Sequence, residues 1–115
     1  MDIQIKLEKT DIHPNEEIKG TVTVNYPGRY DGIVINAQIL DSNELITYTS
    51  YNGKTSKNVS RLFVDHKFMP NGTVEFTGVI DFTPDHTHEV KFRASIIEQH
   101  KEIESDVLFA RIVAL

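Results

Sequence analysis

Hydrophobic and polar residues alternate with a period of two along most of the chain. Ile3, Ile5 and Leu7 begin the pattern, with polar residues between them. Such alternation over roughly 4–8 residues is typical of a β-strand that is buried on one face. The same pattern predicts further strands around residues 17–24, 33–40, 45–51, 62–68, 74–82, 90–96 and 106–115.

Turn-forming residues separate these segments. Pro14 interrupts the alternation after the first strand, and Asn52-Gly53 is the strongest hairpin signal in the chain. Residues 101–105 are polar, and we expect a turn there. No segment has the spacing of an amphipathic helix, so the pattern indicates an all-β protein. We predict an antiparallel two-sheet β-sandwich of the immunoglobulin-like type with seven or eight strands.

The last strand differs from the others because it is apolar on both faces. Leu108, Ala110, Ile112 and Ala114 form one face, and Val107, Phe109 and Val113 flank Arg111 on the other. The outer face of a two-layer sandwich is normally polar. The second apolar face therefore predicts either burial under a loop or a protein interface, with a partner or a second copy of the chain.

Length and composition limit the function classes. The chain has 115 residues, which suits a single domain over residues 1–115, and it has no cysteine for disulfides or thiolate chemistry. Its formal net charge is −5 and its cations are scattered, which argues against nucleic-acid binding. No apolar run is long enough to span a bilayer, so membrane insertion is not expected. Without a recognisable signal peptide, we expect a cytoplasmic protein.

Histidines supply the strongest candidate chemistry. His86 and His88 are two residues apart, so an extended backbone puts both on one side, where they are candidate metal ligands. His100 is a third candidate if the fold brings it close. An exposed polar loop is the competing interpretation, and we expect no metal or other cofactor. His66 shares the phase of Leu62 and Val64, which predicts a position in the core or at its rim.

No pattern predicts catalysis. The chain contains no strained nucleophile elbow and no glycine-rich phosphate loop, so we expect no enzymatic activity and assign no catalytic residue. Gly20 and Gly78 lie in the inward phase of their strands, where glycine leaves space for a large neighbour such as Phe76 or Phe92.

The first 40 residues resemble the opening of arrestin-like domains, a superfamily that includes arrestins and proteins of the Vps26 and Spo0M types. In that pattern a strand and a proline turn precede an x-Gly-x-Val-x-Val strand, a loop and a Gly-Ile strand. The matching positions here are Pro14, Gly20, Val22, Val24, Gly32 and Ile33. The resemblance implies a non-enzymatic adaptor or scaffold that binds proteins through sheet surfaces and loops. Most members have two such lobes, whereas 115 residues supply one.

Three hypotheses follow. The first is a single-lobe, arrestin-like interaction domain that binds a protein partner or itself through a sheet edge and the surface of the last strand, with Val107, Phe109 and Val113 as anchors. The alternative is a small metal- or ligand-binding β-sandwich that uses His86 and His88. The third is one domain of a longer polypeptide, whose last strand packs on another lobe.

Overall fold

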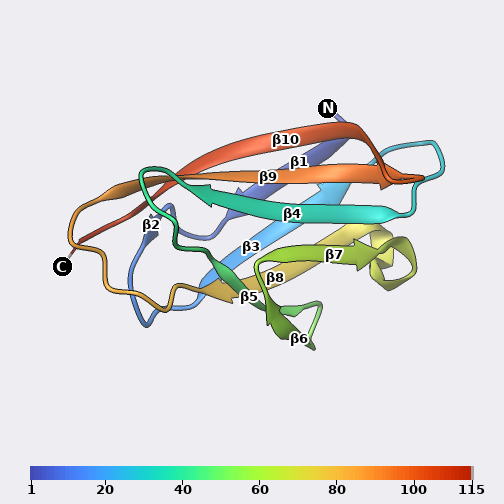
Figure 1. Ribbon diagram of the computed structural model, residues 1–115. Helices are drawn as coiled ribbons and strands as arrows, with labels where there is room; N and C mark the ends of the chain where they lie inside the picture. Colours follow the sequence, from blue (N-terminus) through green and yellow to red (C-terminus); the bar gives the residue numbers. More distant parts are fainter. Residues whose placement is uncertain (115) are drawn as a thin grey trace.

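Two five-stranded sheets pack face to face in the computed structural model, which describes residues 1–114 (Figure 1). The first sheet has the strand order β1-β3-β8-β5-β6, and the second has the order β2-β10-β9-β4-β7. The strands are β1 (Ile3–Leu7), β2 (Asp11–Ile12), β3 (Ile18–Val24), β4 (Gly32–Ile39), β5 (Thr47–Tyr51), β6 (Lys54–Val59), β7 (Arg61–Asp65), β8 (Thr73–Val79), β9 (His88–Glu98) and β10 (Lys101–Ile112). The predicted β-sandwich is confirmed, with ten strands in place of seven or eight.

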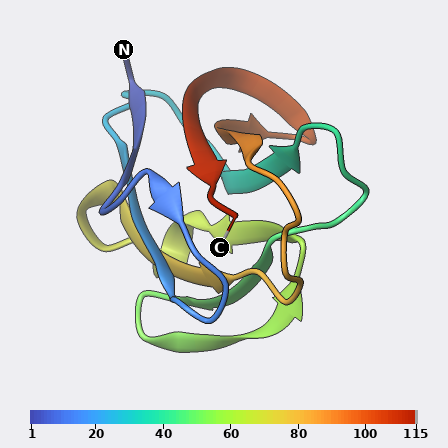
Figure 2. The same ribbon diagram turned by 90° about the vertical axis from the view of Figure 1, so that its left-hand side faces the viewer.

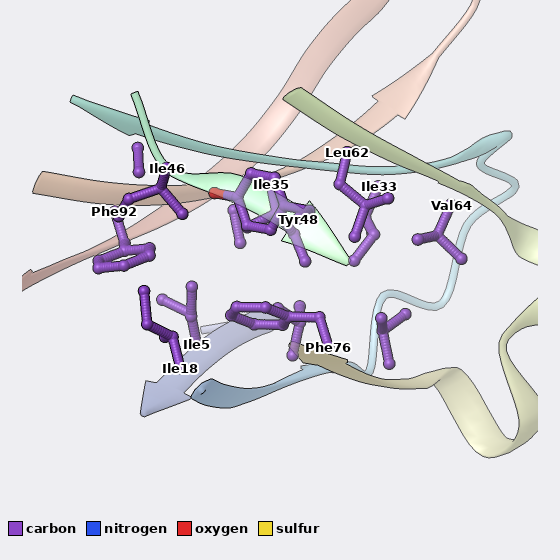
Figure 3. Close-up of a cluster of buried hydrophobic side chains, with 14 of the residues drawn as sticks. Ile5, Ile18, Ile33, Ile35, Ile46, Tyr48, Leu62, Val64, Phe76 and Phe92 are labelled. Carbon is purple, nitrogen blue, oxygen red and sulfur yellow. The ribbon is translucent and has the colours of Figure 1, made fainter. Parts of the chain in front are cut away.

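Inward-facing side chains of both sheets form one buried core (Figure 3). On β3, for example, Ile18, Val22 and Val24 are buried and Lys19 is exposed, as the alternation predicts. Tyr48 of β5, Phe76 of β8 and Phe92 of β9 are the largest fully buried side chains. Burial of such apolar surface is the main favourable term in folding. The chain has no cysteine, so no disulfide adds to it.

Gly20 leaves space for an aromatic ring. It lies directly opposite Phe76 in the β3–β8 pair, and a Cβ atom on Gly20 would overlap the Phe76 ring. The prediction that this glycine accommodates a large neighbour is confirmed.

The β9–β10 hairpin corrects the expected turn at residues 101–105. β10 begins at Lys101, and the connection is made by Gln99 and His100 alone. Both residues have positive φ, 51° and 66°, as a two-residue hairpin turn requires. Asn and Gly normally mark such turns, so the sequence carries no signal here.

Three other elements were not predicted. β2 has only two residues, β6 is polar on both faces, and η1 (His66–Phe68) is a 3-10 helix in place of the end of a strand. The Asp65 side chain accepts a hydrogen bond from the Lys67 N–H, which turns the chain out of β7.

One open side of the sandwich is closed by β1 and β10, which Figure 2 shows beside each other at its upper left (blue and red). Among the strands of residues 1–114, only β2 pairs in parallel, with the end of β10 at Arg111 and Ile112. Further along β10, the Asp106 carboxylate accepts hydrogen bonds from the N–H groups of Ile5 and Val107, both at 3.0 Å. Asp106 thus links an edge strand of the first sheet to β10 of the second.

Candidate functional site

The outer face of the second sheet carries the residues predicted as interface anchors. Ala110 and Ile112 of β10 point inward and are buried. Val107, Phe109 and Val113 lie on the other side, where Val107 and Val113 are half-buried and Phe109 is 54% exposed. The Phe109 side chain is therefore not buried under a loop, which was one of the two expected alternatives.

A second apolar patch lies on the same face, on β4 and β7. Phe63 of β7 is 46% exposed, and its ring comes within 2.9 Å of the position a Gly32 Cβ would occupy. Val34 is directly opposite Phe63 and is only 6% exposed, although it lies outside the sandwich core. Sequence reasoning missed Phe63, whose signal was a large apolar residue at an outward position between buried Leu62 and Val64.

Polar side chains separate the two apolar patches. Asn36 and Gln38 of β4 lie beside Arg93 and Lys91 of β9. Arg93 makes two hydrogen bonds to the Glu102 carboxylate, at 3.1 and 2.6 Å, and Ser95 adds a third at 2.7 Å.

These contacts affect both charged groups. The hydrogen bonds from Arg93 and then Ser95 lower the pKa of Glu102, and the bond to Glu102 raises the pKa of Arg93. Near the end of β10, Arg111 pairs with Asp11 at 3.1 Å. Two of the arginines on this face are therefore already neutralised within the chain.

The outer face of the first sheet has a different character. A hollow of about 680 Å³ lies over it, lined mainly by polar side chains. On β1, β3 and β8 the outward residues, apart from Val79, are Gln4, Lys6, Lys19, Thr21, Thr23, Thr73, Glu75 and Thr77. In the described part of the chain, only the second sheet therefore places exposed phenylalanines, Phe63 and Phe109, on its outer face.

A separate cluster of side chains with donor atoms suited to a metal ion lies where the loop after Pro84 enters β9. One donor atom from each of Asp85, His86 and His88 lies within 4.8 Å of the other two. The imidazole rings of His86 and His88 are 4.1 Å apart, which agrees with their expected placement on one side of an extended segment.

The other histidines lie elsewhere. His100 is in the turn at the opposite end of β9 from His88, so the third candidate ligand does not join the cluster (Figure 1). His66 was expected at the core or its rim, but it is exposed in η1 and stacks on Tyr30 with ring centroids 4.1 Å apart. The strand that would have pointed it inward ends at Asp65.

Fold and surfaces together define a ten-stranded β-sandwich with one polar and one partly apolar outer face. No protein-family model matches the chain, and no curated protein matches its sequence. Several solved structures match its fold. The Salmonella SafD adhesin is 15% identical, with a TM-score of 0.56 and 99% of each chain covered.

Two lipoproteins match at similar levels. A conjugative transposon lipoprotein from Bacteroides eggerthii has 8% identity and a TM-score of 0.54, with 96% of each chain covered. A lipoprotein from Bacteroides thetaiotaomicron has 10% identity and a TM-score of 0.55, with 96% of this chain and 78% of that chain covered. Likeness at such identity shows the fold alone.

These structures correct the arrestin-like resemblance. The three structures named above align with nearly the whole chain, and they are an adhesin and two lipoproteins, not arrestin-like domains. The motif behind the resemblance has a local physical origin, since Pro14 breaks a strand and Gly20 accommodates the Phe76 ring. Any β-sandwich that ends a strand with a proline and packs an aromatic ring against a glycine can show the same motif.

Within residues 1–114, no helix has the length and apolar character needed to cross a bilayer.

Proposed function

We propose that this chain is a non-enzymatic protein-interaction domain that docks through the outer face of its second sheet. The observation that carries the proposal is the exposure of Phe109 and Phe63 on that face. Large aromatic side chains are frequent anchors of protein interfaces, and apolar patches rimmed by polar residues mark such surfaces. Val107 and Val113 extend the patch around Phe109.

The partner proposed is a second copy of the chain. Phe109 lies near one edge of the face and Phe63 near the other, with the Asn36 and Arg93 row between them. A two-fold axis in the plane of contact, passing through this row, would place Phe109 of each copy over Phe63 of the other. Each apolar patch then meets the partner's complementary patch, as a symmetric interface requires.

Charge on the proposed face does not oppose the same arrangement. The chain carries a formal net charge of −5, so two copies repel each other over most of their surfaces. On the proposed face, Glu102 and Asp11 already neutralise Arg93 and Arg111. A cytoplasmic location is a further part of the proposal, to be tested by fractionating the host cell.

Sedimentation velocity over a range of protein concentrations tests the proposal. We expect the wild-type chain to form dimers, and Phe109→Asp to weaken dimerisation by about 30-fold or more, the effect of losing an interface residue worth roughly 2 kcal/mol. Phe63→Asp should have the same effect, because each phenylalanine contacts the other across the axis. Circular dichroism of both variants should match that of the wild-type chain, since both side chains are exposed.

Leu45→Asp is the matched control. Leu45 is also 54% exposed but lies in the loop after β4, and its substitution should leave dimerisation unchanged. A wild-type chain that stays monomeric at every concentration would overturn self-association. Binding of a different protein by the wild-type chain but not by Phe109→Asp would assign the same face to that partner.

A further inference from the structure

We propose that His86 and His88 bind a divalent transition-metal ion, Cu²⁺ or Zn²⁺, and that Asp85 orients His86. This site is separate from the proposed docking face: His88 points toward the interior at the start of β9, and the loop before it holds Asp85 and His86. The buried Pro84 fixes the start of the loop, and the pairing of His88 with Ile112 fixes its end.

Hydrogen bonds define which nitrogen of each imidazole is free. His88 Nδ1 lies 2.8 Å from the Leu40 carbonyl oxygen, which can only accept, so Nδ1 carries the proton. His86 Nδ1 lies 2.7 Å from the Asp85 carboxylate, which is likewise the acceptor. Both neutral rings therefore have their lone pair on Nε2.

This arrangement is the one that metal-binding histidines adopt. A ligating imidazole usually donates its other N–H to a carboxylate or a backbone carbonyl, which fixes the ring and makes it a better ligand. Here Asp85 and the Leu40 carbonyl hold the two rings in that way before any ion binds. An exposed polar loop has no need of two oriented rings 4.1 Å apart.

The donor types select the ion. Two imidazoles, without a thiolate, suit Zn²⁺ and Cu²⁺, and Cu²⁺ binds nitrogen ligands most tightly of the divalent first-row ions. Tetrahedral ligands about 2.0–2.1 Å from a zinc ion lie roughly 3.3 Å from one another. The donor atoms of the two imidazoles, now within 4.8 Å of each other, must therefore close by about 1.5 Å, which the exposed His86 is free to do together with its Asp85 partner.

Isothermal titration of the tag-free, chelator-treated chain with CuCl₂ and with ZnCl₂ tests the site. We expect one ion per chain and a rise in Tm on binding, because an ion that binds only the folded state stabilises it. Asp85→Asn should weaken binding by about 10–100-fold, and His86→Ala should weaken it at least as much.

Controls separate the cluster from unspecific histidine binding. His86 is the preferred variant because its side chain is 60% exposed, whereas His88→Ala would leave the Leu40 carbonyl without its partner. His100→Ala removes another exposed histidine and should bind the ion as the wild-type chain does. The proposal is overturned if neither ion produces heat, if His86→Ala keeps the wild-type affinity, or if His100→Ala loses it.

Discussion

Tyr48 shows at the scale of one residue that a polar group is buried without compensation. Its side chain is fully buried in the core, its hydroxyl has no hydrogen-bond partner within residues 1–114, and burial raises the pKa of that hydroxyl far above its ordinary value (Figure 3). A buried hydroxyl without a partner loses its hydrogen bonds to water and gains nothing in exchange.

Tyr48→Phe should therefore leave the free energy of unfolding unchanged or raise it by about 1 kcal/mol. Urea denaturation measures this. Phe76→Ala, which removes a buried ring from the same core, should cost roughly 3–5 kcal/mol. A loss of more than about 1 kcal/mol in Tyr48→Phe would mean that the hydroxyl does have a partner.

Individual residues also show how far the sequence could predict the candidate sites. The spacing of His86 and His88 placed both rings together, because an extended chain repeats every two residues. The partner that orients His88 is a backbone carbonyl 48 positions away, and no local pattern can reveal such a contact. Phe63 was overlooked for a similar reason, since its patch forms only when β4 and β7 pair.

At the scale of elements, the β9–β10 hairpin was the least predictable part. Its turn uses Gln99 and His100, and the first half of β10 is polar. The hairpin extends this far because Glu102 bonds to Arg93 and Ser95 across the pair, next to an irregularity in the register between Glu102 and Glu104. Polar residues can thus form a strand when their partners are on the neighbouring strand.

The Glu102 contacts predict a pH-dependent contribution to stability. The pKa of Glu102 is lower in the folded chain than in the unfolded one. At a pH between these two pKa values, the folded state therefore binds fewer protons than the unfolded state. The contribution is fully present above the ordinary pKa of a glutamate, about 4.3, and is lost as the pH falls through the lower folded value. Acid therefore removes it.

Glu102→Gln should lower the Tm slightly at pH 7, since the pair is exposed, and the difference from the wild-type chain should disappear near pH 3. Thermal melts by circular dichroism across this pH range measure it. Glu75→Gln, on an exposed outward position of β8, is the control and should follow the wild-type curve. A difference that persists unchanged at pH 3 would contradict the assignment.

At the scale of the whole molecule, alternation was enough to predict a two-sheet sandwich, because a period of two buries one face of every strand. It was not enough to predict which strands are neighbours. The parallel pairing of β2 with β10 joins residues 100 positions apart, such as Asp11 and Arg111, and it consists of two residue pairs. The arrestin-like resemblance was wrong for the same reason, since it compared local strand patterns and these are shared by unrelated sandwiches.

A substitution of Asp106 tests how the two sheets are held together where β1 lies beside β10. Asp106→Ala removes the acceptor of the Ile5 and Val107 N–H groups, and we expect a loss of about 1–3 kcal/mol in the free energy of unfolding, measured by urea denaturation. Amide hydrogen exchange at Ile5 should become faster, because its N–H would lose the acceptor that Asp106 provides. Asp81→Ala is the control, since this exposed residue follows β8 and should leave both measurements unchanged. If Ile5 stays as protected in Asp106→Ala as in the wild-type chain, the edge is held by apolar packing between the sheets and not by the carboxylate.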